Sequence, residues 1–487
     1  MTNQTCIFLC LTSLPSFICS FLVFSISLTY TNTNKTHTYF FIDWRIYSYM
    51  KRIRTVLSLF LLFLFFIAGQ AGSLHRIKAA NLSSSGEPTK ESSTKNENER
   101  IHSYHIPSKS AYPIHPSAFI DKDGLLLGKT VKKQNHPSTT PKNTDTEAVL
   151  MFTGDLMCLN AQQTAARQKK AYDFTDSFSY VKQIFERSDL LVGNLETQIS
   201  TSNPLTSEKI YINNQPNCNG PSSYLDAVTD AGFDCVVTAN NHCMDGGLTG
   251  ALETLHSLDS FLLPHTGTFS SNETDRYLLC DANGITVAIL SYTELINNRN
   301  ALSAAKMDKY VNCYSAARVK SDIAKAKEAG AEFIIVYNHW GTENTHVVTS
   351  TQTADAKAIA DAGADLIIGS HPHCLQQASY IRTADDREVL CMYSMGNFLS
   401  SMTREINQDT IILSLTLKRT NDVISYDTPG YYPCHIYRNY KKQSFIILPI
   451  SKDLNGGVKT KDLAAAEKRI KKVIGDSILC LNGAVSE

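Results

Sequence analysis

Five apolar segments of this chain end in the same way, and this repetition constrains the fold more than any other feature of the sequence. From residue 147 onward, short apolar runs alternate with segments of helical periodicity. Each of the five runs leads through a glycine or asparagine to a carboxylate, amide or imidazole, and the five ends read FTGD, VGNLE, TANNH, YNHWG and IIGSHPH. Alternating short strands and helices predict a sheet covered on both faces. Such sheets carry their sites at the carboxyl ends of the strands, so we expect an α/β domain whose polar strand ends lie close together.

The main domain predicted from this pattern spans residues 147–405. Its clearest helix reads SAARVKSDIAKAKEAG, with Ser315 as the N-terminal cap and Gly330 at the C-terminal end. No repeat of fixed length is visible in the domain. The pattern on its own therefore indicates a covered α/β sheet and does not specify how many sheets there are.

The C-terminal residues 406–487 are expected to complete the same domain. Residues 410–419 and 444–450 have the composition of strands, and residues 461–475 have the spacing of an amphipathic helix.

The polar side chains at the five strand ends are the candidate site residues. They are Asp155, Glu196, Asn241 with the adjacent His242, His339, His371 and His373. Taken singly, each has an ordinary alternative. Asp155 could cap a helix, Glu196 could lie on the surface, and His339 could pack beside Trp340. The two histidines of GSHPH, separated by one proline, could simply occupy a turn.

Taken together, these residues predict a metal centre. Carboxylate, amide and imidazole ligands suit divalent cations such as Zn, Mn or Fe. One carboxylate can bridge two ions about 3.5–4 Å apart, and such a pair activates water and clamps the attacking and leaving oxygens of a displacement. We therefore expect two divalent metal ions and no other cofactor.

The cysteines do not indicate a second kind of site. The chain has 13 of them, scattered and without a CxxC pair, so neither a disulfide framework nor a zinc–thiolate site is predicted. Cys235 and Cys391 lie in apolar runs and are expected to be small core residues.

The N-terminal region carries two apolar segments. Residues 6–28 are apolar over a length that could cross a bilayer. Residues 50–71 begin with Met50 and three basic residues, continue with an apolar core, and end in small residues, which is the order of an export signal. We interpret 50–71 as a signal peptide or membrane anchor, with cleavage after Ala71 left open. Residues 1–49 are then either an over-extended N-terminus or an extra apolar segment that forms a membrane hairpin with the second.

Residues 72–146 are predicted to be a flexible linker. They are rich in Ser, Thr, Lys, Asn and Pro, as in LSSSGEPTKESSTKNENER, and few apolar residues recur at any period. Such a segment cannot bury enough apolar surface to fold by itself. The predicted organisation is thus a folded domain tethered outside the cytoplasmic membrane, exported or membrane-anchored.

Six motifs give the chain a resemblance to a known family. In order they read FTGDLM, VGNLET, TANNHCMDGG, NHWGTE, IIGSHPH and YSMGNF, and they extend over residues 148–402. They resemble the motifs of the CapA family of capsule-synthesis or poly-γ-glutamate-biosynthesis proteins. CapA-like domains are in turn similar to the calcineurin-like metallophosphatases. The resemblance implies a β-sandwich flanked by helices (αββα) that carries a two-metal site.

The resemblance also implies roles for individual residues. Asp155 and His373 would bind a first metal, and Glu196 would bridge it to a second. Asn241, His339 and His371 would complete the second metal's shell, with Asn240 as a less favoured substitute for Asn241. His242 would stay free of metal and act as a general acid or electrostatic clamp. Glu343 and Asn397 are candidates for orienting the ligands.

Two departures from the calcineurin-like pattern bear on the first metal. Those enzymes carry a histidine two residues after the first aspartate, whereas this chain has Met157 there. The bridging residue is Glu196, which is one carbon longer than the aspartate of the pattern. The first metal is therefore expected to have fewer ligands than the second.

Two functions follow from the resemblance and the candidate site. The first is a metal-dependent hydrolase-like enzyme that acts on phosphoryl or γ-glutamyl centres in capsule or poly-γ-glutamate biosynthesis. The second is a non-catalytic subunit of cell-surface polymer synthesis or export. The intact His339, His371 and His373 set favours the first, and Met157 favours the second.

The expected partners are an anionic cell-surface polymer or its precursor, membrane-bound polymer synthesis proteins, and the membrane itself through the N-terminal segment. The 46 Lys and Arg residues balance the 46 Asp and Glu residues, so the formal net charge is zero. This balance gives no electrostatic reason to expect nucleic acid as a partner.

Overall fold

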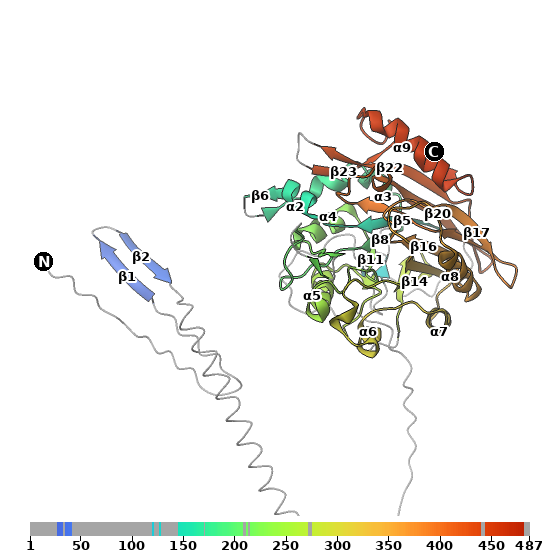
Figure 1. Ribbon diagram of the computed structural model, residues 1–487, viewed down its shortest axis with the longest axis horizontal. Coiled ribbons are helices and arrows are strands. Elements are labelled where there is room, and N and C mark those ends of the chain that lie inside the picture. The colour runs from blue at the N-terminus through green and yellow to red at the C-terminus, as the bar shows by residue number, and fades with distance from the viewer. Residues whose placement is uncertain are drawn as a thin grey trace, which may run out of the picture. The chain divides into compact units, whose positions relative to one another are not determined.

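Two β-sheets packed face to face form the folded part of the protein in the computed structural model (Figure 1). The structure describes residues 27–32, 35–40, 119–120, 126–127, 145–169, 171–207, 211–212, 215–270, 275–439 and 444–481. Helices pack on the outer faces of both sheets. This mixed α/β sandwich confirms the αββα architecture expected from the family resemblance, and it corrects the simpler covered sheet that periodicity alone indicated.

The first sheet has ten strands and contains the N-terminal half of the candidate site. It runs in the order β12, β11, β8, β5, β20, β22, β23, with β19 beside β5, β21 beside β20 and β24 beside β22. Its strands are β5 (Thr146–Leu156), β8 (Leu190–Leu195), β11 (Cys235–Val237), β12 (His265–Thr266), β19 (Asn397–Leu399), β20 (Asp409–Thr420), β21 (Val423–Tyr426), β22 (Gly430–Asn439), β23 (Ser444–Pro449) and β24 (Leu479–Cys480).

The second sheet has eight strands and contains the C-terminal half of the site. It runs in the order β17, β18, β16, β15, β14, β13, β4, β3. Its strands are β3 (Phe119–Ile120), β4 (Leu126–Leu127), β13 (Leu278–Ala282), β14 (Ile285–Thr293), β15 (Phe333–His339), β16 (Leu366–Ser370), β17 (Ala378–Arg382) and β18 (Glu388–Met392).

Several helices cover the outer faces of the two sheets (Figure 1). The helices are α2 (Asn160–Ala166), α3 (Lys182–Phe185), α4 (Ser223–Ala231), α5 (Gly247–Ser260), α6 (Ala304–Tyr310), α7 (Ala316–Glu328), α8 (Ser350–Asp361) and α9 (Lys461–Ile474), with 3₁₀ turns η1 (Thr175–Phe178), η2 (Arg299–Ala301) and η3 (Glu405–Asn407). Side chains of α3, α4 and α5 pack against the ten-stranded sheet. Those of α7 and α8 pack against the eight-stranded sheet.

The main core lies between the sheets and follows from the alternation of side chains along each strand. On β5, Leu150 and Phe152 face the opposite sheet, whereas Met151 faces the helices. The buried surface of β14 divides in the same way, with Val287 turned inward and Ala288 outward. The site-bearing strand β5 and its counterpart β14 therefore bury both faces over most of their length, which is why these segments read as nearly continuous apolar runs.

Helix α7 illustrates how local sequence sets the ends of an element. The Ser315 side chain accepts a hydrogen bond from the backbone N–H of Arg318 and so caps the helix. The chain then leaves the helix at Gly330, whose φ of 98° suits a residue without a β-carbon. Both ends predicted from the sequence are confirmed.

The C-terminal segment contributes strands to the same sheet as the N-terminal strands of the main domain. Strand β20 inserts between β5 and β22 and runs antiparallel to both. Helix α9 buries Ile470 and Ile474 in the core between the sheets. The segment supplies a central strand of the first sheet and not merely an edge.

Two short strands, β3 and β4, lie inside the span that the sequence predicts to be a linker. Strand β4 pairs in parallel with β13 and antiparallel with β3. Ordered pairing in the structure therefore begins before residue 147.

The N-terminal part is a separate unit, residues Met1–Glu97. Within it, the structure describes a hairpin of β1 (Ser27–Asn32) and β2 (Lys35–Phe40). The predicted signal segment 50–71 lies outside the described residues. Among the helices that are described, none combines the length and apolarity needed to cross a membrane.

Candidate metal centre

The candidate ligands come together because neighbouring strands end at the same place. In the ten-stranded sheet, β5 and β8 run parallel, so Asp155 lies beside Asn194 and Glu196 follows directly. In the eight-stranded sheet, β15 and β16 run parallel, with His339 paired to Ser370. His371 and His373 follow at once. Parallel strands thus deliver ligands from both sheets to one buried site.

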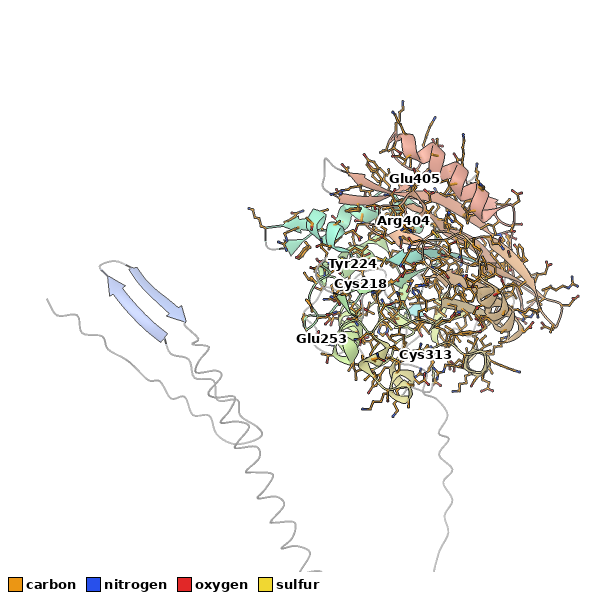
Figure 2. The ribbon with its side chains drawn as sticks, viewed as in Figure 1. Cys218, Tyr224, Glu253, Cys313, Arg404 and Glu405 are labelled. Atoms are coloured by element: carbon orange, nitrogen blue, oxygen red, sulfur yellow. The ribbon has the colours of Figure 1, made fainter. Side chains whose placement is uncertain are left out.

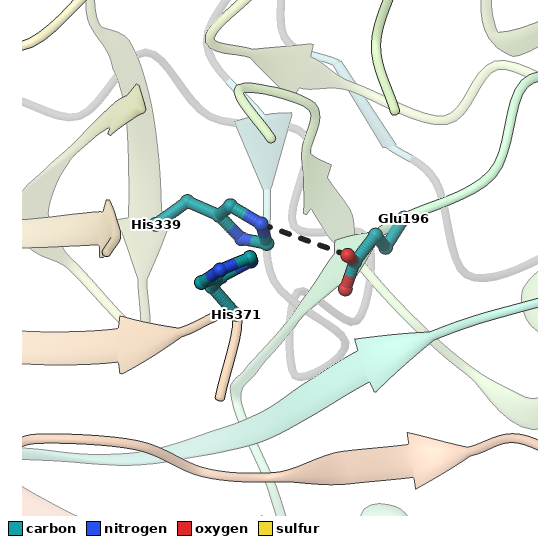
Figure 3. A group of neighbouring side chains, drawn as sticks. All are labelled: Glu196, His339 and His371. Carbon is teal, nitrogen blue, oxygen red and sulfur yellow. Dashed lines mark ion pairs between the residues drawn. The ribbon is translucent and has the colours of Figure 1, made fainter. Parts of the chain in front are cut away.

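One group of ligands consists of Glu196, His339 and His371 (Figure 3), and Asn241 joins it through a contact with His339. The His339 Nε2 atom lies 3.6 Å from Glu196 Oε1 and 3.0 Å from Asn241 Oδ1. The ring centroids of His339 and His371 are 4.8 Å apart. Ser370 Oγ lies 2.8 Å from His339 Nδ1, which leaves Nε2 facing the other ligands. This is the set that the sequence assigned to the second metal.

A second group consists of Asp155, Glu196 and His373. His373 Nδ1 lies 3.4 Å from Asp155 Oδ2, and His373 Nε2 lies 3.7 Å from Glu196 Oε1. Asn397 Oδ1 lies 3.0 Å from His373 Nδ1, and the Asn194 amide donates to Asp155 Oδ1 at 2.8 Å. These contacts fix the orientation of the ring and of the carboxylate. This is the set assigned to the first metal, and Glu196 belongs to both groups.

Unpaired polar atoms show that the two groups suit metal ions. Among the described buried side chains, Asp155 Oδ2, both carboxylate oxygens of Glu196 and Nδ1 of His371 have no hydrogen-bond partner. Buried charged or polar atoms without partners are costly and unusual. The Nε2 atoms of His339 and His373 lie 3.0–3.7 Å from Asn241 Oδ1 and Glu196 Oε1, close to the roughly 3.0–3.4 Å that bonds of about 2.1 Å place between ligands around one cation. The donor set therefore fits divalent ions.

The electrostatics of the site point the same way. Burial, together with the charge of Asp155, raises the pKa of Glu196 well above its usual value. Burial and the neighbouring imidazoles lower the pKa of His339, and burial with His373 lowers the pKa of His371 to about 3. Burial lowers the pKa of His373 too, but Asp155 outweighs it and leaves that pKa raised. Without a cation, the paired carboxylates repel each other, whereas His339 and His371 are held neutral, which is the form that binds metal.

The backbone of GSHPH is held in an unusual conformation. His371 has φ of 95° and His373 has φ of 55°, so both histidines on either side of Pro372 occupy the left-handed region. Such conformations are uncommon for residues other than glycine and collect at functional sites. GSHPH is a turn, which was the ordinary alternative for this motif. The turn nevertheless directs the rings of His371 and His373 to different ligand groups.

Two glycines let backbones approach closely beside the ligands. A β-carbon on Gly154 would lie 1.9 Å from the carbonyl oxygen of Gly396, and one on Gly369 would lie 1.9 Å from that of Tyr393. Glycine is therefore required immediately before Asp155 and two residues before His371. These contacts explain why glycine recurs at the strand ends in the sequence.

His242 lies at the edge of the centre with partners of its own. Its Nδ1 atom is 2.7 Å from Asp245 Oδ2, and its Nε2 atom is 3.7 Å from Cys218 Sγ. The carboxylate of Asp245 also accepts the backbone N–H of Cys218 at 2.7 Å. Burial raises the pKa of the Cys218 thiol, with Asp245 and Glu196 adding to it, so the thiol stays protonated at neutral pH.

The structure distinguishes between the adjacent asparagines. Asn240 donates its amide to Asn194 Oδ1 and to the carbonyl of Leu195, so it serves the scaffold. Asn241 instead directs Oδ1 at His339 Nε2. This geometry favours Asn241 over Asn240 as the ligand, as the sequence analysis preferred.

Of the two residues expected to orient the metal ligands, one contacts a ligand and the other does not. Asn397 contacts His373 as an orienting residue should, whereas Glu343 is exposed and affects Glu196 only through its charge. Met157 is buried, and its backbone carbonyl accepts hydrogen bonds from Gln162 and Tyr224.

Sequence reasoning did not identify Asn194, Asp245 or Cys218. Asn194 contacts Asp155 and Asp245 contacts His242, so both act through other residues. The spacing of three residues between His242 and Asp245 could have indicated their contact. Cys218 is 24 residues from His242 and belongs to no CxxC pair, so no local pattern marked it. The structure adds it to a third group of possible ligand atoms, Cys218, His242 and Asp245.

Comparisons with known proteins agree with the six sequence motifs that resemble the CapA family. The model of the family described as "Bacterial capsule synthesis protein PGA_cap" matches residues 149–402. The chain is 28% identical over 326 residues to the PGA biosynthesis protein CapA of Bacillus subtilis (strain 168), covering 64% of this chain and 80% of that protein. It is 26% identical over 306 residues to the capsule biosynthesis protein CapA of Bacillus anthracis, covering 62% and 71%.

Among solved structures, the chain is similar to the calcineurin-like phosphoesterase YfkN of Bacillus subtilis. The identity is 13% and the TM-score is 0.33, over 68% of this chain and 98% of that one. The two packed sheets of this protein define its architecture independently of that match.

Proposed function

Because the chain belongs to the bacterial capsule synthesis protein PGA_cap family, we propose that it is a metal-dependent hydrolase of capsule or poly-γ-glutamate biosynthesis. One observation carries this proposal. A single buried carboxylate, Glu196, belongs to two ligand groups and has no hydrogen-bond partner on either oxygen. A carboxylate in that position suits a bridge between two cations and has no evident structural use.

In the proposed centre, the chain's own residues hold two divalent ions, of the Mn, Zn or Fe class. Asp155, Glu196 and His373 hold the first, and Glu196, Asn241, His339 and His371 hold the second. Bound there, the ions would polarise the substrate and activate a water molecule. Asn397 and Ser370 contact Nδ1 of His373 and of His339, respectively, so Nε2 of each ring would be the atom that binds metal.

His242 is the proposed general acid. Asp245 accepts the Nδ1–H of its ring, so that Nε2, which lies 3.7 Å from Cys218 Sγ, is the nitrogen that would pass a proton to a leaving group. The same carboxylate fixes the orientation and tautomer of the ring. The proton donor is therefore positioned by a residue that does not itself touch the substrate.

The substrate proposed is a phosphoryl ester or a γ-glutamyl amide of an anionic cell-surface polymer or its precursor. The matched relatives are named for PGA and capsule biosynthesis, and a cationic centre suits an anionic chain. We further propose that the protein acts outside the cytoplasm, through export or anchoring by its N-terminal segment, alongside membrane-bound polymer synthesis proteins. Nucleic acid is not a proposed partner.

A second candidate function rests on Met157. A thioether stands where the calcineurin-like pattern has a histidine, and the first ligand group has three members. A centre with a weak first ion would bind an anionic polymer without hydrolysing it. The chain would then be a non-catalytic subunit of polymer synthesis or export.

One experiment separates these functions. The full-length protein is purified, its metal content is measured, and hydrolysis of phosphoesters and of poly-γ-glutamate is assayed with added Mn²⁺ or Zn²⁺. The hydrolase is expected to turn over one of the two substrates, and His371→Ala to abolish turnover. His256→Ala, an exposed histidine on α5, is the control that keeps it. Metal binding without turnover of either substrate would favour the non-catalytic subunit.

A further inference from the structure

A thiol, an imidazole and a carboxylate meet beside the proposed centre, and the proposed hydrolase makes no use of the thiol. Cys218 Sγ lies 3.7 Å from His242 Nε2, and Asp245 Oδ2 lies 2.7 Å from His242 Nδ1 (Figure 2 labels Cys218). All three residues are buried. Their potential ligand atoms lie within 4.8 Å of one another.

The distance between sulfur and nitrogen suits a bound cation better than a close hydrogen bond. In tetrahedral zinc sites the metal–sulfur bond is about 2.3 Å and the metal–nitrogen bond about 2.0–2.1 Å, which places the two ligand atoms roughly 3.6 Å apart. The observed 3.7 Å matches that separation. The two side chains would need little movement to share one ion.

The carboxylate behind the ring has the arrangement of a metal-supporting residue. A histidine bound to metal usually donates its other ring N–H to a carboxylate, which fixes the tautomer and raises the ring's basicity. Asp245 Oδ2 does this for His242 and also accepts the backbone N–H of Cys218. One carboxylate therefore fixes both potential ligands relative to each other.

A second, independent observation points to a ligand. The other carboxylate oxygen, Asp245 Oδ1, is buried and has no hydrogen-bond partner, and the whole residue is only 2% exposed. A buried carboxylate with an unsatisfied oxygen beside a thiol and an imidazole adds a negative charge, and the groups that contact its other oxygen are the Cys218 backbone N–H and the His242 ring. A cation at this point would compensate that charge.

We propose that Cys218, His242 and Asp245 form a third cation site, selective for thiophilic divalent ions such as Zn²⁺, Co²⁺ and Cd²⁺. Cys218 Sγ and His242 Nε2 bind the ion directly, and Asp245 orients the ring and neutralises charge. The cation displaces the thiol proton on binding. The proposed two-metal centre has oxygen and imidazole donors and accepts Mn²⁺, whereas a thiolate selects softer ions.

An ion in the third site affects the proposed hydrolysis. This step rests on the proposed function. The ion takes His242 Nε2, the nitrogen assigned to proton donation. A thiophilic cation then inhibits hydrolysis even when the two-metal centre is already filled. Binding itself does not depend on that role, so it can be tested separately.

The test of binding is a titration of Cd²⁺ and Co²⁺ into the full-length protein preloaded with Mn²⁺. Formation of a metal–thiolate bond is followed by its ultraviolet charge-transfer absorbance. Wild type is expected to gain this absorbance with one equivalent of ion, and Cys218→Ser to lack that component. Cys391→Ser, which removes another buried thiol, and His371→Ala, which disrupts only the two-metal centre, are expected to retain it.

Two results would overturn the site. One is an equal absorbance in wild type and Cys218→Ser; the other is loss of the absorbance in His371→Ala, which would assign it to the two-metal centre. If Cys218→Ser unfolds, as judged by circular dichroism, Cys218→Ala serves the same purpose.

Inhibition is measured separately, with hydrolysis by the Mn²⁺-loaded protein as the readout. Cd²⁺ is expected to inhibit wild type at concentrations that leave Cys218→Ser active. Binding at Cys218 without inhibition would retain the cation site and reject the role of His242.

Discussion

His339 and His373 direct ring nitrogens at the same carboxylate oxygen, Glu196 Oε1, from 3.6 and 3.7 Å. The two histidines come from different strand ends and belong to different ligand groups. The shared oxygen accepts no hydrogen bond. This relationship is the structural basis for a centre of two ions with one bridging carboxylate.

Replacing the Glu196 carboxylate should stabilise the metal-free protein. It should also reduce the extra stability that bound metal gives. Burial is the main cause of the raised pKa of Glu196, followed by the charge of Asp155, and Glu196→Gln removes both effects because its side chain does not ionise. The variant should therefore melt at a higher temperature than wild type in chelator. Ion at about a hundredfold excess over Kd should stabilise wild type by about 2.7 kcal/mol, and the variant by much less.

The control for this comparison is Glu388→Gln, an exposed glutamate on β18, which should behave as wild type. Thermal unfolding with and without chelator is the measurement. A Glu196→Gln protein that melts lower in chelator and keeps the full metal stabilisation would contradict the bridging role.

Removing the carboxylate behind His242 should slow catalysis without removing metal. In Asp245→Asn, the ring of His242 loses the acceptor that fixes its tautomer. General acid catalysis contributes about 10²–10⁴-fold, so kcat should fall by about a hundredfold or more while KM changes little. Steady-state kinetics and metal analysis on the same preparation test both halves of the prediction.

Asp259→Asn provides the matched control, because Asp259 contacts a different histidine, His265, at 3.3 Å. Its kcat should equal that of wild type. An Asp245→Asn enzyme with normal kcat would remove His242 from the role of acid.

The acid stability of the protein should depend on Glu253 (labelled in Figure 2). Its carboxylate accepts hydrogen bonds from the hydroxyls of Ser202 and Ser200 and from backbone N–H groups, which lower its pKa to about 2. The pKa in the unfolded chain is about 4.3. Because the folded-state pKa is the lower one, the ionised carboxylate stabilises the fold above the unfolded value, and this stability is lost as the pH falls toward 2.

Glu253→Gln should therefore be less stable than wild type at neutral pH, and the difference should shrink as the pH falls below about 4.3. Urea unfolding at a series of pH values measures it. A difference between the two proteins that stays constant over that range would show that Glu253 is not the group responsible.

The location of the site could be predicted because strand ends are visible in sequence. Asp155, Glu196, Asn241, His339, His371 and His373 each follow an apolar run, and parallel pairing brings such ends together. The division of GSHPH between two ligand groups came from the family resemblance, and the positive φ values of His371 and His373 show the backbone geometry behind it.

The sheet order could not be predicted, for a physical reason. Strand β20 pairs with β5 although more than 250 residues separate them in the chain. Apolar alternation marks both strands as buried but does not specify which buried strand lies next to which. The same limit applies to Cys218, whose approach to His242 depends on the tertiary fold.

The most direct test of the two-metal centre is the metal content of the purified full-length protein, measured by inductively coupled plasma mass spectrometry after loading and desalting. After loading with Mn²⁺, which the proposed third, thiolate-containing site does not favour, wild type and the His256→Ala control should carry about two divalent ions per chain. His371→Ala and His373→Ala should each carry fewer, because they remove ligands from different groups. Equally low metal in wild type and both histidine variants, under all loading conditions, would contradict the account.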